Sequence, residues 1–384
     1  MTKRKSNDRL LGIKREDEIM YFKCDGLDLS EAINKVIKAT STKTTAPILE
    51  GIKLSAHGDS LTLSATDLEL SIEKTIKAEV ITDGETVVPG KLFSEYLRKL
   101  TNEQISFELN DKNQLKIAYT DSVGYIQCMD VVEFPEIKDI ERGSYFEISK
   151  SALKGLINKV LFAVATDDSR PILKGIKFEV INGEIKLVAL DGYRLSIATK
   201  KVENSTDDFT FVVPGRCLGE ISKMLEGEDS VKVYIHSNNL MLDMEDTVVI
   251  TRLLEGQFIN YKQILSSNFT TTATINKSQL EDAIERASIL SKADKNNLVK
   301  FDIKENVLTL TSDSEIGNVK ENITVAMKGS DITIAFNSKY FTDCLRVVDD
   351  EFIKINFTNS ILPCIITPSE GEDYLFLILP VRMM

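Results

Sequence analysis

Three segments of the chain carry apolar residues at the spacing of a helix with one buried face. The first stripe falls at positions i, i+3, i+4, i+7 and i+8, and consists of Leu29, Ala32, Ile33, Val36 and Ile37. The second stripe has the same spacing and consists of Leu153, Leu156, Ile157, Val160 and Leu161. A looser third stripe consists of Leu280, Ala283, Ile284 and Ala287. Asp28 and Glu31 are spaced as a capping box, so we expect Asp28 to cap the first helix.

Short stretches of alternating apolar and polar residues follow the first stripe at 52–56, 61–65 and 71–76. Alternation of this kind predicts antiparallel strands with one buried face. A second helix is predicted after Val-Val-Pro-Gly at 87–90, with inward residues Leu92, Phe93, Tyr96, Leu97 and Leu100. Counterparts are predicted after Val-Val-Pro-Gly at 212–215 and from Lys339 through Arg346.

These patterns belong to an internal repeat. Pro-Ile-Leu-Glu-Gly-Ile-Lys at 47–53 returns as Pro-Ile-Leu-Lys-Gly-Ile-Lys at 171–177, which is 124 residues later. The helix that begins at Lys339 lies 248 residues after Lys91, which is twice that spacing. We therefore expect three modules, near 20–142, 143–268 and 269–384. The predicted fold class is α+β, with two helices on one face of an antiparallel sheet in each module.

Residues 1–19 belong to no copy of the repeat. Two interpretations stay open: a disordered N-terminal extension, or a leader ahead of a physiological start at Met20. A nucleic-acid-binding tail is a weaker third interpretation, because acidic residues in the second half of the segment offset its basic ones.

Composition excludes several classes of protein. The chain has 384 residues, of which 42% are hydrophobic and 28% charged, and no long apolar run, so we expect a cytoplasmic protein without a membrane span. Five scattered cysteines and two histidines have no metal-site spacing. We find no nucleotide-binding loop or nucleophile motif and expect neither a cofactor nor an enzyme. Asp67 and Asp191 occupy equivalent positions, where we expect them to end strands at turns.

The formal net charge is −12, which by itself argues against a nucleic-acid partner. The six predicted helices, however, carry a net charge of +9, which leaves −21 on the rest of the chain. This count covers 31–43, 91–100, 150–163, 216–225, 277–292 and 339–346. If these helices share one surface, that surface is basic and suits a polyanion such as DNA.

Three motifs carry a resemblance to a known family: Ala-Leu-Asp-Gly-Tyr-Arg-Leu-Ser at 189–196, Glu-Gly-Gln-Phe-Ile-Asn-Tyr at 255–261 and Leu-Pro-Val-Arg-Met at 379–383. Together with the repeat they resemble the bacterial DNA polymerase III beta subunits, the sliding clamps, over residues 20–384. The resemblance implies a head-to-tail homodimeric ring that encircles duplex DNA, slides along it and tethers the replicative polymerase. It also implies an ATP-dependent clamp loader and other clamp-motif proteins as partners. The alternative is a repeat-built scaffold that binds only proteins.

The resemblance also implies three groups of site residues. Weak, sequence-independent phosphate contacts are expected from Lys35, Lys38, Lys43, Lys91, Lys154, Lys159, Arg170, Lys223, Lys339 and Arg346. A pocket for a short peptide with a Gln and paired hydrophobic residues is expected from Leu190, Gly192, Arg194, Leu195, Ile259, Ile264, Pro363, Leu379, Pro380, Val381, Arg382 and Met383. The dimer interface is expected from Tyr125, Ile126, Ile289 and Leu290, although Ile289 and Leu290 could instead be ordinary core.

Two residues of the pocket depart from the family pattern. Leu190 stands where the family usually has Thr, and Ile259-Asn260 replaces the usual Pro-Asp. These changes imply a narrower or differently selective pocket.

Overall fold

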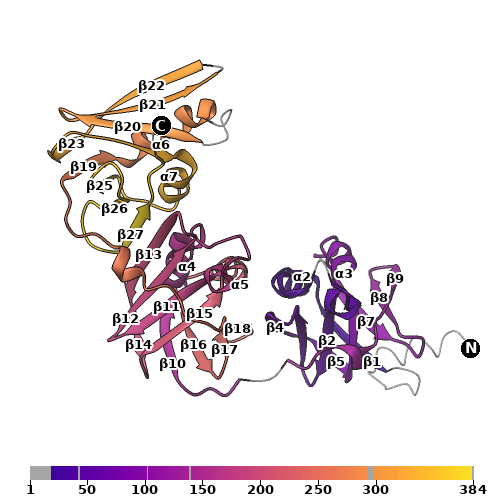
Figure 1. Ribbon diagram of the computed structural model, residues 1–384. Coiled ribbons are helices and arrows are strands. Elements are labelled where there is room, and N and C mark those ends of the chain that lie inside the picture. The colour runs from indigo at the N-terminus through magenta and orange to yellow at the C-terminus, as the bar shows by residue number, and fades with distance from the viewer. Residues whose placement is uncertain are drawn as a thin grey trace, which may run out of the picture. The chain divides into compact units, whose positions relative to one another are not determined.

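The computed structural model describes residues 19–41, 44–101, 103–137, 140–291, 297–315 and 317–382, with the backbone alone at 290 and 291. These residues form two compact units (Figure 1). Unit 1 takes the described residues up to Tyr145 together with Val231–Arg252, and unit 2 takes Phe146–Ser230 and the described residues from Leu253. The strands at 231–252 belong to unit 1 because they pair onward to β4. The three-module boundaries therefore stay a prediction.

The described part of unit 1 contains two antiparallel sheets. One has the strand order β5-β1-β7-β8-β9, and the other includes the run β16-β17-β18-β4-β3-β2-β6. The strands are β1 Met20–Asp25, β2 Gly51–His57, β3 Ser60–Thr66, β4 Leu70–Lys77, β5 Glu79–Thr82, β6 Gly84–Pro89, β7 Gln104–Leu109, β8 Gln114–Tyr119, β9 Ser122–Gln127, β16 Ser230–His236, β17 Asn239–Asp243 and β18 Thr247–Arg252.

Two helices of unit 1 confirm the predicted stripes, with two corrections. Helix α2, Gly26–Val36, packs on β3 and β4 and against α3, Gly90–Leu97. The predicted cap at Asp28 is wrong: Asp25, the last residue of β1, accepts hydrogen bonds from the amides of Leu27 (2.8 Å) and Asp28 (3.2 Å). Leu92 is also wrong as an inward residue, since it is 52% exposed. Leu92 precedes the buried Phe93 by one position, and one residue of an α-helix rotates the side-chain direction by about 100°, so Leu92 points away from the core.

The sheets of unit 2 are also antiparallel. Its described strands form a short β14-β10 pair, the sheet β15-β11-β12-β13-β27-β26-β25-β19-β23 and the sheet β22-β21-β20-β24. The strands are β10 Tyr145–Ser149, β11 Gly175–Ile181, β12 Glu184–Leu190, β13 Arg194–Lys201, β14 Asn204–Ser205, β15 Phe209–Pro214, β19 Thr271–Asn276, β20 Leu298–Lys304, β21 Val307–Ser314, β22 Gly317–Thr324, β23 Ala326–Gly329, β24 Ile332–Asn337, β25 Phe352–Phe357, β26 Cys364–Pro368 and β27 Tyr374–Ile378.

Four helices cover these sheets in two pairs. Helix α4 packs against β12, β13 and α5, while α6 packs against β20, β21, β22 and α7. Their bounds are α4 Lys150–Leu161, α5 Gly215–Ser222, α6 Lys277–Ser291 and α7 Ser338–Leu345. The buried residues Leu153, Leu156, Ile157 and Val160 confirm the second stripe, and Leu280, Ala283, Ile284 and Ala287 confirm the third. The predicted α+β class is thus confirmed.

The repeat is visible in the strand positions. Strands β2, β3 and β4 begin at 51, 60 and 70, β11, β12 and β13 at 175, 184 and 194, and β20, β21 and β22 at 298, 307 and 317. The internal spacing is the same in the three copies. Asp67 accepts hydrogen bonds from the amides of Glu69 and Leu70, and Asp191 accepts them from Tyr193 and Arg194. Both aspartates therefore form the turns expected of them.

The cysteines form no disulfide with one another and belong to no metal-holding group in the described part of the chain. None of the five cysteines forms a disulfide, all five are buried, and burial raises the pKa of the Cys24 thiol to about 12. Among the described residues no group of three or more His, Cys, Asp or Glu side chains is arranged to hold a metal ion. No described helix has the length and apolar character needed to cross a membrane.

Candidate functional site

The predicted DNA contacts lie on the paired helices and their adjoining turns. Lys35 is in α2, Lys38 is in the 3-10 turn Ile37–Ala39 after it, Lys91 is in α3, and Lys154 and Lys159 are in α4. Lys91 is exposed and the other four are half-buried. Four further residues are exposed: Arg170 before the 3-10 turn Pro171–Lys174, Lys223 at the end of α5, Lys339 in α7 and Arg346 at its end. Lys43 lies outside the described residues.

Ion pairs neutralise much of the positive charge on α6 and α7. Arg286 of α6 donates two hydrogen bonds of 2.9 Å to Glu321, which lower the pKa of that carboxyl. Arg346 lies 3.4 Å from Glu285, and Lys277 lies 2.7 Å from Glu281. The groove between α6 and α7, about 820 Å³, is consequently lined by residues of both signs. Among the described residues, the basic surplus therefore rests mainly on α4, which has three lysines and no acid, and on Lys38, Arg98 and Lys99 just after the ends of α2 and α3.

Two sheets end in strands that have one partner each among the described residues. Strand β9 ends the sheet of unit 1, and β22 ends the smaller sheet of unit 2. Tyr125 in β9 is 61% exposed, whereas Ile126 is buried. Ile289, near the end of α6, is 68% exposed and is therefore not core. Nothing is described of the Leu290 side chain.

A glycine shapes the middle of β9. A Cβ atom on Gly124 would lie 2.4 Å from the hydroxyl oxygen of Tyr96, which hydrogen-bonds to the hydroxyl of Tyr119 at 3.2 Å. Burial and this hydrogen bond raise the pKa of Tyr96 to about 12. Gly124 thus lets the Tyr96 ring lie directly against the edge strand.

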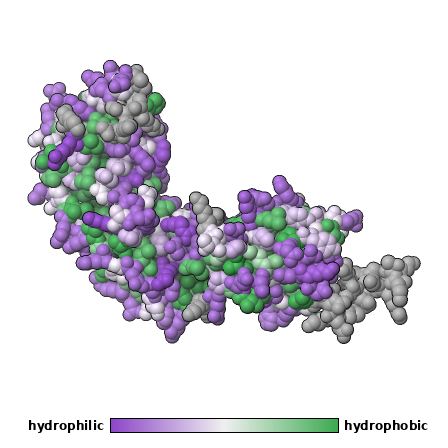
Figure 2. Space-filling view, turned by 45° about the vertical axis from the view of Figure 1, so that its right-hand side comes forward, coloured by the Kyte–Doolittle hydropathy of each residue, from purple (hydrophilic) through white to green (hydrophobic). Residues whose placement is uncertain are grey.

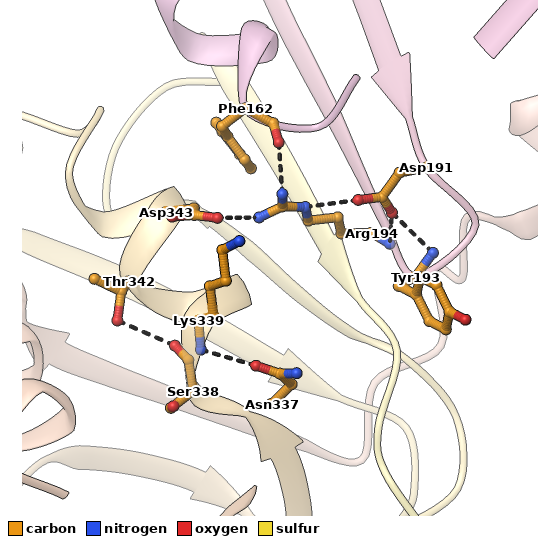
Figure 3. Close-up of polar contacts among 9 residues, drawn as sticks. All are labelled: Phe162, Asp191, Tyr193, Arg194, Asn337, Ser338, Lys339, Thr342 and Asp343. Atoms are coloured by element: carbon orange, nitrogen blue, oxygen red, sulfur yellow. Dashed lines mark hydrogen bonds and ion pairs between the residues drawn. The ribbon is translucent and has the colours of Figure 1, made fainter. Parts of the chain in front are cut away.

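Arg194 joins three parts of unit 2 near the predicted pocket (Figure 3). Its Nε donates to Asp191 at 3.0 Å, its Nη1 to Asp343 of α7 at 2.6 Å, and its Nη2 to the carbonyl oxygen of Phe162 at 2.6 Å. The side chain is only 9% exposed. Burial opposes its charge, but the contacts with Asp343 and Asp191 outweigh that effect and raise its pKa. The guanidinium therefore ties the second repeat to α7.

Aromatic rings complete the surroundings of this guanidinium. Its central carbon lies 5.2 Å from the ring centre of Phe162 and 4.9 Å from that of Tyr340. Tyr340 stacks in turn on Tyr193, with ring centres 5.9 Å apart. Tyr193 is 60% exposed, so one ring of this stack is open to solvent.

The end of the described chain is held against the same turn. The amide of Leu379 donates to the Tyr193 carbonyl at 2.9 Å, and the amide of Val381 donates to the Ala335 carbonyl at 2.8 Å. The predicted residues Leu379, Pro380, Val381 and Arg382 are thus described next to β27, while Met383 lies outside the described residues. Pro363 precedes β26, the strand paired with β27.

The other predicted pocket residues divide into a floor and a rim. Leu190 and Leu195 are paired across β12 and β13 and are 4% and 1% exposed, so they form the floor. Ile259 packs on the same apolar cluster from the connector before β19. Ile264 in the 3-10 turn Tyr261–Ile264 is 46% exposed and Leu379 is 37% exposed, so they belong to the rim. Gly192 has a φ of +91°, a conformation that favours glycine in the turn.

Several residues of this region were missed by the sequence analysis. Asp343 and Tyr340 approach Arg194 from α7, about 150 residues along the chain, and no local pattern announces such a contact. Ile361 and Leu362, in the loop before β26, are 75% and 41% exposed. Tyr193 lay inside the motif at 189–196 and could have been chosen on that ground.

Hydrophilic residues dominate the visible face, with smaller hydrophobic patches between them (Figure 2).

Family comparisons match the chain in three consecutive stretches. Residues 20–138 match the N-terminal domain of the DNA polymerase III beta subunit, residues 147–260 its central domain and residues 262–382 its C-terminal domain. These matches cover nearly all of the residues that carry the repeat.

Individual relatives and structures agree with these matches. A beta sliding clamp of Halalkalibacterium halodurans is 32% identical over 378 residues, which is 94% of this chain and 100% of that protein. The DNA polymerase sliding clamp of Bacillus subtilis has a similar structure, with a TM-score of 0.92 and 30% identity over 95% of this chain and 100% of that one. A putative DNA polymerase III beta subunit from Eubacterium rectale gives a TM-score of 0.91 at 34% identity, over 95% of this chain and 100% of that one.

Proposed function

The chain belongs to the DNA polymerase III beta subunit family, the bacterial sliding clamps, and we propose that three of its surfaces carry out the three tasks of a clamp. It is a DNA polymerase processivity factor, which works as a ring formed by a dimer around DNA. The observation that carries this conclusion is the succession of the three family domains along residues 20–382. The assignment of individual residues below is our proposal.

The first surface is the basic face of the helices, which we assign to the DNA backbone. Support comes from Lys35 and Lys38 at α2, Lys91 in α3 and Lys154 in α4, because α4 carries three lysines and no acid, and further basic residues lie just after the ends of α2 and α3. Flexible lysines attract phosphates without reading bases, and many of their contacts pass through water. Such contacts hold DNA without fixing its register, which is what sliding requires.

The second surface consists of the two sheet edges, which we assign to the dimer. An edge strand offers unpaired backbone groups, so β9 of one copy can pair with β22 of a second copy. The exposed Tyr125 and Ile289 would add apolar contact beside this pairing. Ile126 is buried, so its share in the interface would come from its backbone. A head-to-tail contact of this kind closes a ring when the rotation allows it.

The third surface is the pocket of unit 2, which we assign to partner peptides. The buried Leu190 and Leu195 give it an apolar floor, and the exposed Ile264 and Leu379 give it a rim that a hydrophobic side chain can cover. Arg194 is already committed to Asp191 and Asp343, so we expect it to position the turn rather than to grip the peptide. The partners would be the replicative polymerase, the ATP-dependent loader and other clamp-motif proteins.

Deletion of residues 379–384 tests the pocket. We expect the truncated protein to lose binding of a labelled peptide that carries a Gln and paired hydrophobic residues, measured by fluorescence anisotropy. The dimer mass should stay unchanged, which serves as the control for folding. Binding that remains within about threefold of the full chain, a change of roughly 0.6 kcal/mol, would exclude the tail from the site.

The alternative of a scaffold that binds proteins without encircling DNA is wrong, because the chain belongs to the family of sliding clamps. We propose no catalytic role, because the tethering task needs binding surfaces alone.

A further inference from the structure

A large groove lies on the sheet face of unit 2 that is turned away from α4. Its volume is about 1030 Å³, and its lining comes from β12, β13, β25, β26, β27 and the connector before β19. Ser196 donates to the Lys159 carbonyl oxygen of α4, so the neighbouring Leu195, Ile197, Thr199 and Lys201 of β13 face the other way. The groove therefore shares a sheet face with the floor of the pocket.

Along this face the side chains change from apolar to basic. Paired positions of β12 and β13 run from Leu190 and Leu195, through Val188 and Ile197, to Lys186 and Thr199, and end at Glu184 and Lys201. Ile197, Tyr261, Leu265 and Leu375 belong both to the apolar cluster beneath the pocket and to the groove lining. Lys201 lies six positions after Leu195 along the strand, which places the two residues roughly 20 Å apart.

The groove has more positive than negative side chains. Its lining includes Lys186, Lys200, Lys201, Lys262 and Lys354 against Glu184, Glu372 and Asp373. Lys200 pairs with Asp373 at 2.8 Å, and Lys186 lies 3.6 Å from Glu184. Lys201 and Lys262 are exposed, and the charge of Lys262 also helps to lower the pKa of Glu179. This local surplus stands in a chain whose net charge is −12.

We propose that the groove binds an acidic segment of a partner protein that lies beside the peptide held in the pocket. Charge complementarity with the lysines and continuity with the pocket floor both favour this occupant. The exposed Phe269 and the half-buried Leu265 add apolar contact for side chains between the acids. DNA is a poorer occupant, because the apolar side chains of Ile197, Leu265 and Leu375 in the lining offer a sugar-phosphate backbone no partner. The proposal rests on the proposed peptide pocket and extends it.

Fluorescein-labelled peptides of three kinds test the proposal by anisotropy on the full chain. The core peptide carries the Gln and the paired hydrophobic residues, the second adds a run of Glu after a spacer of about six residues, and the third replaces that run with Gln. Both ends of the core are extended in separate probes. We expect one Glu-tailed probe to bind about fivefold more tightly than its Gln-tailed match at low salt, and this gain to shrink in high salt.

Substitutions then locate the gain. Lys201→Glu with Lys262→Glu should abolish it and leave the core peptide unaffected. Lys77→Glu with Lys300→Glu makes the same charge change on exposed strand residues outside the groove, and should preserve the gain. Equal binding of Glu-tailed and Gln-tailed probes, or a gain that survives the groove substitutions or is lost equally in the control, would overturn the inference.

Two further outcomes are distinguishable. Failure of the core peptide to bind would refute the proposed pocket, and the inference with it. The other outcome is that a single-stranded oligothymidylate abolishes the extra affinity of the Glu-tailed probe in a way that requires Lys201 and Lys262. That result would assign the groove to nucleic acid and overturn the inference, while the pocket stands.

Discussion

Replacement of Arg194 with Ala should destabilise unit 2 and loosen the pocket together. The substitution leaves the carboxylates of Asp191 and Asp343, which are 15% and 20% exposed, without their shared cation, and it removes the donor to the Phe162 carbonyl. Removing one partner of a buried ion pair costs about 3–5 kcal/mol. Because both carboxylates keep some contact with water, we expect about 3 kcal/mol.

The assay is urea unfolding followed by far-ultraviolet circular dichroism and by tyrosine fluorescence, since the chain contains no Trp. With an m-value of about 3 kcal/mol/M, the midpoint of the unit 2 transition should fall by about 1 M. Hydrogen exchange should rise at 189–196 and at 338–346, the two segments that Arg194 connects. Peptide affinity should fall as well, because the Tyr193 carbonyl that holds Leu379 belongs to the same turn.

Three comparison variants sharpen this prediction. Arg194→Lys keeps a charge, but its compact ammonium cannot reach all three acceptors that the broad guanidinium spans, so we expect it to lose roughly half as much stability. Lys223→Ala breaks an exposed pair with Glu220 and should cost less than about 1 kcal/mol. Arg194→Met combined with Asp191→Asn and Asp343→Asn should recover most of the loss, because no charge is left unpaired. An Arg194→Ala variant as stable as Lys223→Ala, or unchanged exchange at 338–346, would refute the reasoning.

Three other predictions address the DNA face, the dimer and the acid limit of stability. Changing Lys38, Lys91 and Lys159 to Glu should weaken DNA binding and flatten its salt dependence in a filter-binding titration, with the dimer intact; unchanged binding at low salt would exclude the basic face. Changing Ile289 and Leu290 to Ala should give a folded monomer in sedimentation, and an unchanged dimer mass would exclude these residues from the interface. Burial opposes ionisation of Glu179, but hydrogen bonds from Lys177 and Tyr261 prevail and lower its pKa below 4.5. The ionised Glu179 therefore stabilises the fold above about pH 4.5, and this stabilisation is lost as the pH falls through the lowered pKa. In urea titrations between about pH 5 and pH 3, Glu179→Gln should therefore lose less stability than the unsubstituted chain.

Local patterns were sufficient for most of the fold. The apolar stripes of α2, α4 and α6 and the repeated strands follow from side-chain period alone, and the repeat strengthens each assignment by presenting it again. Errors occurred where two neighbouring residues offered the same chemistry. Asp25 and Asp28 can both cap a helix, and the choice of Asp25 depends on where β1 ends. Leu92 and Phe93 are both apolar, and the short α3 buries Phe93.

The site was less accessible to sequence reasoning, because its contacts join distant segments. Arg194 was identified as a pocket residue, but its bonds to Asp343 and to the Phe162 carbonyl depend on how β13, α4 and α7 pack. The sequence also counted Arg346 as a candidate DNA contact, and only the structure brings it within 3.4 Å of Glu285. The net charge of each helix can be counted from the sequence. The share of that charge that is already neutralised by ion pairs can be seen only in the structure.

The central claim is that the chain forms a ring around duplex DNA. The most direct test loads the full chain onto a nicked circular plasmid with its ATP-dependent loader, raises the salt to remove phosphate contacts that do not depend on encirclement, and measures bound protein by gel filtration before and after one cut of the plasmid. A ring predicts stable retention on the circle and loss through the free ends after cutting. Equal amounts of bound protein on circular and cut DNA, or none on either, would contradict it.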